Sequence, residues 1–239
     1  MRKAIVLFSG GLDSTACLYW ALEKYDSVSL LSFLYGSKED EVIERTNKTF
    51  GDFFSIESKI ISLPFLKEFT AKAGSNLSQS VEDLPEFKEF EKLNEKDITL
   101  VSAKKVWVPG RNLLFLSIAA SAADSEKSSV DIIFGANMEE GETFPDNTED
   151  FVERMNAAMK LGCMNKVRVI SPFITSDKKD IVLFLNEKSA KYEFSSSCYR
   201  ITGWTKDGRP IHCGKCESCL RRKRAFSNAN IEDKTLYAE

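Results

Sequence analysis

Short apolar runs alternate along this chain with segments whose apolar residues recur at helical spacing. The first run, residues 4–8, is continuously apolar and predicts a strand buried on both faces, as in a parallel sheet. After it, Cys17, Leu18, Ala21 and Leu22 recur with the period of a helix. The same alternation continues and predicts strands over residues 4–8, 27–34, 56–63, 130–136 and 167–171.

Local signals predict where several helices begin and end. A helix over residues 39–50 is expected to stop near Gly51. Asn147 or Thr148 is expected to cap a helix, and Ser176 is expected to cap another. The helices that follow the first are predicted over residues 39–50, 113–123, 148–162 and 177–187.

Strands and helices that alternate at these lengths predict an α/β protein with a doubly wound parallel sheet. We assign residues 1–190 to this domain and residues 191–239 to a small C-terminal lobe. Residues 67–105 are polar and rich in charge, so we expect a mobile insertion or lid there, with a solvated helical lobe as the alternative. Ligands of such sheets bind at the carboxyl ends of the strands, which is where candidate chemistry should gather.

The turn between the first strand and the first helix carries the strongest chemical signal. It reads Phe8-Ser9-Gly10-Gly11-Leu12-Asp13-Ser14-Thr15. Such a turn aims backbone N–H groups and the positive end of a helix at one point, which suits an anion. The glycines allow close approach, and the hydroxyl groups add donors. No lysine follows the glycines, so the turn is not a Walker A motif.

Composition and charge narrow the class of protein. The chain has 239 residues, 43% of them hydrophobic and 29% charged, which is typical of a globular protein with a sizeable core. Its net charge of -3 argues against general binding of polyanions. No apolar run reaches about 18 residues, and the chain enters a core strand at once, so we expect neither a membrane span nor a signal peptide. We therefore expect a cytoplasmic protein.

Three of the six cysteines lie close together near the C-terminus, at Cys213, Cys216 and Cys219. In a cytosolic chain this spacing indicates metal binding rather than disulfides. Cys198 would complete four thiolates, a set typical of tetrahedral structural zinc without an open position. His212, the only histidine, competes for the fourth place, but two adjacent ligands are geometrically awkward, so Cys198 is favoured.

The order of these motifs resembles a known enzyme family. The Ser9 turn resembles the pyrophosphate loop of N-type ATP pyrophosphatases, which split ATP between the α- and β-phosphates and adenylate a substrate. With Val108-Pro109-Gly110-Arg111-Asn112, Phe144-Pro145-Asp146 and the cysteine cluster, the chain resembles the 7-cyano-7-deazaguanine synthase family over nearly its whole length. The resemblance implies an adenine-nucleotide alpha-hydrolase-like fold with a zinc-binding lobe.

This resemblance also implies a reaction. The family converts 7-carboxy-7-deazaguanine into the nitrile: ATP adenylates the carboxylate, ammonia gives an amide, and a second adenylation allows dehydration, with AMP and pyrophosphate released. It further implies Mg²⁺ with ATP, structural Zn²⁺ and a homodimer.

The residues that match the family by position divide into four sets. For ATP they are Phe8, Ser9, Gly10, Gly11, Asp13, Ser14 and Thr15; for catalysis Asp13, Arg111 and Lys178; for the deazaguanine substrate Tyr35, Asn112, Glu140, Phe144 and Asp146; and for zinc Cys198, Cys213, Cys216 and Cys219. The alternatives are a surface ion pair for Arg111, a solvated residue for Lys178 and a core residue for Phe144.

Departures from the family pattern leave other functions open. Glu39 stands where the family usually has histidine, Asn147-Thr148 where it has cysteine and arginine, and Glu140 where it has aspartate. These differences predict intact adenylation but poor nitrile formation, so the carboxylate could instead pass to another amine, such as a protein terminus in an antiphage operon. Two further alternatives are the tRNA or sulfur chemistry of related enzymes, and a zinc-ribbon nucleic-acid module suggested by the basic run 221–224. That run is otherwise expected to be a solvated helix face or a dimer contact.

Overall fold

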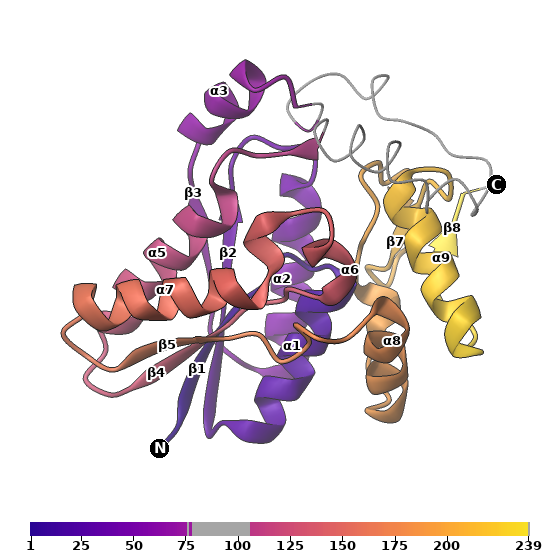
Figure 1. Ribbon diagram of the computed structural model, residues 1–239. Coiled ribbons are helices and arrows are strands. Elements are labelled where there is room, and N and C mark those ends of the chain that lie inside the picture. The colour runs from indigo at the N-terminus through magenta and orange to yellow at the C-terminus, as the bar shows by residue number, and fades with distance from the viewer. Residues whose placement is uncertain (76, 78–105, 239) are drawn as a thin grey trace.

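A five-stranded parallel sheet forms the centre of the computed structural model, which describes residues 1–75, 77 and 106–238 (Figure 1). The strand order is β3-β2-β1-β4-β5, and every neighbouring pair is parallel. The predicted doubly wound sheet is therefore confirmed. The strands are β1 Lys3–Leu7, β2 Ser27–Leu34, β3 Ser58–Ser62, β4 Val130–Ile133 and β5 Val167–Ile170.

Helices cover both faces of this sheet and bury a separate apolar cluster on each (Figure 1). The first cluster joins β1 to α1 Leu12–Lys24, to α8 Lys178–Glu187 and, through Phe50, to α2 Asp40–Phe54. The second joins the opposite face to α3 Phe65–Lys72, α5 Arg111–Asp124 and α7 Glu149–Gly162. Because the chain winds one way from β1 to β3 and the other way from β4 to β5, a crevice opens where β1 meets β4.

Two predicted helix boundaries are wrong. Helix α2 continues through Gly51 and ends at Phe54, followed by the C-cap Ser55, whose φ is 50°. Gly51 has a packing role instead, since a Cβ there would lie 3.1 Å from the Ser58 hydroxyl oxygen. At α8 the cap is Asp177 rather than Ser176: its carboxylate accepts from the backbone N–H of Asp180, and the Asp180 carboxylate accepts in return. Thr148, one of the two predicted caps, does cap α7.

The C-terminal segment adds α9 Glu217–Ala229 and a second sheet of three short strands. These strands are β6 Gly203–Trp204, β7 Pro210–His212 and β8 Leu236–Tyr237. Helix α9 packs against α8, and its Phe226 belongs to the same buried cluster as α1. The division of the chain at residue 190 stays a prediction.

Arg222 of α9 lies at the centre of this segment, with 1% of its surface exposed. Its guanidinium donates to the Thr235 hydroxyl at 2.8 Å, the Ser195 hydroxyl at 3.0 Å and the Tyr192 carbonyl at 2.8 Å. Lys223, its neighbour, donates to the Gly214 carbonyl. The expectation of a solvated basic face over residues 221–224 is therefore wrong.

Part of the predicted insertion is ordinary helix, because α3 begins at Phe65 and buries Leu66 and Thr70. The rest of that prediction, residue 76 and residues 78–105, lies outside the described residues. Across the part of the chain that the structure describes, no helix has both the length and the apolar character needed to cross a membrane.

Candidate active site and cysteine cluster

A cleft of about 290 Å³ opens at the carboxyl ends of β1, β2 and β4. Its wall includes the Ser9 turn, the residues that follow β2 and β4, and the first turns of α5, α8 and α9. Enzymes of this architecture bind ligands at such a position. Most of the residues predicted for ATP, catalysis and substrate line it: Phe8, Ser9, Gly11, Asp13, Ser14, Tyr35, Arg111, Asn112, Glu140, Phe144, Asp146 and Lys178.

The Ser9 turn is held by its own hydroxyl groups. Thr15 donates its hydroxyl to the Gly11 carbonyl at 2.8 Å, and Ser14 donates to the same oxygen at 3.1 Å. Ser9 and Ser14 place their hydroxyl oxygens 3.3 Å apart. Gly11 is the N-cap of α1, so the first N–H groups of the helix face the turn without intrahelical partners. Gly10 and Thr15 are absent from the cleft wall and support the turn from behind.

Gly10 has a φ of 76°, and a Cβ there would lie 2.0 Å from the Thr46 hydroxyl oxygen. Gly10→Ala should therefore lower the free energy of unfolding by about 2–5 kcal/mol, the sum of left-handed strain and overpacking. It should also weaken ATP binding, because the turn must shift. Chemical denaturation and ATP titration measure both. Gly208→Ala is the matched control, since Gly208 has a φ of 87° and no atom within 4 Å of its Cβ position. Equal losses in the two variants would contradict the packing argument.

Lys178 bridges two carboxylates across the cleft. Its Nζ lies 2.9 Å from Asp13 Oδ2 and 2.9 Å from Glu140 Oε1. Burial alone would lower the pKa of Lys178, but the two carboxylates outweigh it and raise that pKa, so the ammonium stays charged. Burial raises the pKa of Asp13 against the opposing charge of Lys178. Asp13 Oδ1 is buried and has no hydrogen-bond partner among the described residues. The alternative of a solvated Lys178 is wrong, because the residue is 9% exposed.

Arg111 is a second cation that lines the cleft. Its Nη1 lies 3.5 Å from the Tyr35 hydroxyl oxygen. Although burial opposes it, the neighbouring Tyr35 and Glu39 raise the pKa of Arg111. Burial in turn raises the pKa of Glu39 and of Asp146, and in both cases Arg111 is the main opposing charge. Arg111 is therefore a permanent cation in the cleft rather than part of a surface ion pair.

Aromatic rings line the same cleft. Trp107 and Phe144 lie nearly parallel, with an interplanar angle of 11° and their centroids 6.0 Å apart. Phe144 is in the cleft wall and not in either apolar cluster, so the core alternative is wrong. Asp146, beside it, accepts a hydrogen bond from the Asn147 side-chain amide at 3.0 Å. A flat heterocycle with N–H donors matches this combination of rings and carboxylate.

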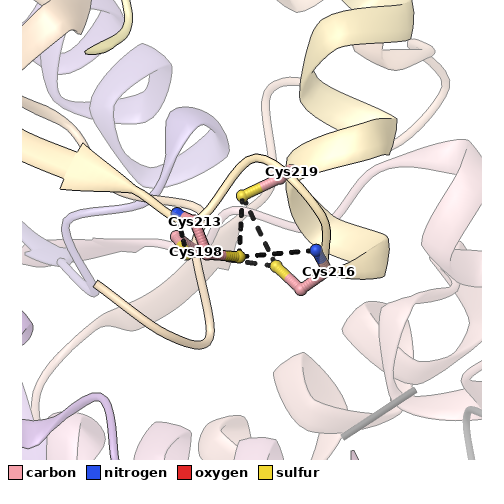
Figure 2. Close-up of side chains that lie close together, drawn as sticks. All are labelled: Cys198, Cys213, Cys216 and Cys219. Carbon is pink, nitrogen blue, oxygen red and sulfur yellow. Dashed lines mark hydrogen bonds between the residues drawn. The ribbon is translucent and has the colours of Figure 1, made fainter. Parts of the chain in front are cut away.

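Four buried cysteines converge in the C-terminal segment, as Figure 2 shows. The sulfurs of Cys198, Cys213, Cys216 and Cys219 all lie within 4.8 Å of one another, with Cys213–Cys219 at 3.9 Å and Cys198–Cys216 at 4.0 Å. A tetrahedral metal with bonds of about 2.3 Å would hold its sulfurs about 3.8 Å apart, so the set fits. Backbone N–H groups of Arg200 and Cys213 donate to the Cys198 sulfur at 3.2 and 3.3 Å.

His212 does not belong to this cluster. Its ring is fully buried and meets Tyr237 edge-on, with centroids 5.7 Å apart. Burial lowers the pKa of His212 to about 3, so the ring is neutral. The four cysteine sulfurs converge without His212, which agrees with the preference for Cys198, and the metal-ligand set stays a prediction.

Comparison with known proteins matches almost the whole chain. Residues 3–230 match the model of a family described as queuosine biosynthesis protein QueC. The chain belongs to the QueC family. Relatives of this QueC chain include the 7-cyano-7-deazaguanine synthase of Pyrococcus abyssi, 49% identical over 242 residues, which cover 99% of this chain and 98% of the relative. The same enzyme of Pyrococcus horikoshii is 50% identical over 237 residues, with coverage of 99% and 98%.

One solved structure aligns with the whole chain at low identity. The predicted subunit of a tRNA methyltransferase from Methanocaldococcus jannaschii aligns with a TM-score of 0.44 and 13% identity, over 100% of this QueC chain and 93% of its own.

Several residues that line the cleft of this QueC chain were not predicted from the sequence. Trp107, Glu139, Tyr199, Glu217 and Arg221 all line it. The only sequence signal for Trp107 and Glu139 is their position, because each directly precedes a predicted motif or site residue. The other three come from the C-terminal segment, and only the fold shows that this segment reaches the Ser9 turn: the Ser196 N–H donates to the Gly10 carbonyl at 2.7 Å.

Proposed function

We propose that this chain is an ATP-dependent 7-cyano-7-deazaguanine synthase that forms AMP and pyrophosphate. The observation that carries the proposal is one cleft that combines a glycine-serine turn at a helix N-terminus, the cations Lys178 and Arg111, and the aromatic ring of Phe144 beside Asp146. Relatives that are about 50% identical to this chain over nearly their full length are named 7-cyano-7-deazaguanine synthase.

In this proposal the Ser9 turn and Lys178 hold the phosphates of ATP, with Arg111 at the reacting α-phosphate or carboxylate. The substrate carboxylate oxygen attacks the α-phosphorus, and pyrophosphate leaves. Ammonia then attacks the acyl carbon and displaces AMP to give the amide. The amide oxygen attacks the α-phosphorus of a second ATP and a second pyrophosphate leaves, after which loss of AMP and protons gives the nitrile. Charge builds on phosphate oxygens at the phosphoryl-transfer steps, which is where fixed cations lower the barrier.

Two metals belong to the proposal. Mg²⁺ accompanying ATP would neutralise phosphate charge, and Asp13, with its unpartnered buried oxygen, is the residue that would hold it. The four-cysteine cluster fits Zn²⁺, and four thiolates leave no open position, so this metal would support the fold rather than react.

Substrate recognition would use the aromatic rings and the carboxylate beside them. Phe144 and Trp107 offer faces for the deazaguanine ring, and Asp146 accepts from its N–H groups. Tyr35, Asn112 and Glu140 complete the wall around it.

Transfer to another amine has no specific support. Asn147 and Thr148, which depart from the family pattern, have structural partners here: Asn147 holds Asp146, and Thr148 caps α7. The nucleic-acid alternative is also unsupported, because Arg222 of the basic run is buried. We therefore propose the nitrile as the main product.

Incubation with ATP, Mg²⁺, ammonium and 7-carboxy-7-deazaguanine tests this function. Mass spectrometry should detect the nitrile, and chromatography should detect two AMP for each nitrile. Omission of the deazaguanine should abolish AMP formation. ADP formation without AMP would contradict the proposed chemistry. AMP with the amide as the only product would show that the second adenylation fails, and would contradict the nitrile as the main product.

A further inference from the structure

We propose that Arg224 of α9 is a positioning residue for Lys178 and acts through Glu139. The proposal rests on the function above only in giving Lys178 the phosphates of ATP. It links helix α9, which contains Cys219 and begins directly after Cys216, to the cation at the Ser9 turn.

The link consists of three contacts in series. Arg224 Nη2 donates to Glu139 Oε2 at 3.2 Å. The other oxygen of that carboxylate, Oε1, accepts the backbone N–H of Lys178 at 3.0 Å. Lys178 Nζ then lies 2.9 Å from both Asp13 and Glu140. Each carboxylate oxygen of Glu139 therefore has a separate partner, and the side chain joins α9 to the first turn of α8.

Arg224 is well placed to act as a fixed anchor. Helix α9 begins directly after Cys216, and its first turn contains Cys219, so one end is tied to the cysteine cluster. Buried Arg222 ties the middle of the helix to residues 192–197. Helix α9 also packs along α8, beside which it lies in Figure 1. Arg224 thus projects from a helix held at several points.

The ion pair between Arg224 and Glu139 is less exposed to solvent than ion pairs on the surface of this molecule. Arg224 and Glu139 side chains are 20% and 25% exposed, whereas those of Arg154 and Asp150 are 77% and 68% exposed. Exposed ion pairs contribute little to the free energy of unfolding. A partly desolvated carboxylate that loses its cationic partner, by contrast, becomes an uncompensated charge. Here that charge would lie in the cleft wall, on the residue next to Glu140.

Loss of the contact between Arg224 and Glu139 would affect Lys178 and the bound ATP in two ways. The Lys178 N–H is one of the first in α8 and has no partner within the helix, so Glu139 is what fixes it to the rest of the cleft. A displacement of about 1 Å of a positioned group can cost about 100-fold in rate. Loss of Arg224 would also leave Glu139 free to repel the phosphates of ATP.

The test compares Arg224→Met, Arg224→Lys, Glu139→Gln and the double variant Arg224→Met/Glu139→Gln. Arg154→Met is the control, because it makes the same change in an exposed pair. We expect Arg224→Met to keep wild-type metal content but to weaken Mg·ATP binding, measured by calorimetry, and to lower kcat, each about tenfold. Arg224→Lys should recover part of both, and the control should change neither. The KM for 7-carboxy-7-deazaguanine should stay within twofold.

The double variant separates positioning from a general effect. If both residues act through one link, it should be no worse than the poorer single variant. Multiplied losses in the double variant, or wild-type ATP affinity and kcat in folded, metal-replete Arg224→Met, would overturn the proposal. ATP affinity needs no deazaguanine, so a wild-type protein that binds ATP but makes no product would refute the proposed function and still leave this link testable. A wild-type protein that does not bind ATP overturns both.

Discussion

Asp13→Asn is expected to lower kcat/KM for AMP formation by about 100- to 1,000-fold, the usual loss when one fixed charge-stabilising group is removed from an active site. Asp13 is the only predicted residue that lies in the Ser9 turn and also contacts Lys178. Its Oδ2 contacts the ammonium, and its buried Oδ1 has no partner among the described residues. The amide keeps the shape of the side chain but loses the negative charge that would hold both Lys178 and the magnesium accompanying ATP. Pyrophosphate release, followed with a coupled assay, measures the loss.

Asp150→Asn makes the same chemical change at an exposed carboxylate paired with Arg154. It should leave the rate unchanged. Circular dichroism should show both variants folded. A folded Asp13→Asn protein with a rate near that of the wild type would exclude the role assigned to this carboxylate.

Cys216→Ser is expected to remove bound zinc and to destabilise the C-terminal segment. Cys216 is 2% exposed, and its sulfur lies 3.4 Å from that of Cys219 and 4.0 Å from that of Cys198. A structural zinc site contributes on the order of 10 kcal/mol to the folding of its surroundings. Because Cys216 is also the N-cap of α9, the loss should reach Arg222 and the core contacts of Phe226. Metal analysis should give one zinc per wild-type chain and less than one tenth of that in the variant.

Cys163→Ser provides the matched control, since Cys163 is partly exposed and lies outside the cluster. It should keep its zinc and its melting temperature. Wild-type protein purified under reducing conditions without zinc, or a Cys216→Ser variant with full zinc, would refute the assignment.

The sequence predicted the framework of the fold well because its signals there are local. The apolar run of β2 matches the strand from Ser27 to Leu34 at both ends. The predicted stop at Gly51 failed because a glycine can also serve a close approach between elements, here to Ser58 of β3. That approach depends on a tertiary contact, which helical periodicity does not contain. The prediction of Ser176 as a cap failed for a local reason, because Asp177, one residue later, forms a capping box with Asp180.

The residues of the site also fall into those that local motifs predict and those that only tertiary contacts reveal. Residues joined by short motifs, such as the Ser9 turn and the cysteine cluster, could be grouped from their spacing alone. The burial of Arg222 in the basic run could not be predicted in this way, because its hydrogen-bond partners are Tyr192, Ser195 and Thr235. Glu139 was overlooked for a similar reason: its partners come from α8 and α9, far along the chain. Long-range pairings of polar side chains leave little trace in a single sequence.

The central place of β1 also has a consequence for how the protein is made. This strand leaves the ribosome before the other strands of the sheet, yet one of its two edges pairs with β4, beginning with Lys3 opposite Val130. At typical elongation rates that edge waits roughly 6–25 s for its partner. During this interval a mainly apolar strand offers unpaired backbone groups to other chains. Newly made protein should therefore depend on chaperones until β4 emerges, and rapid overproduction should favour aggregates over folded enzyme.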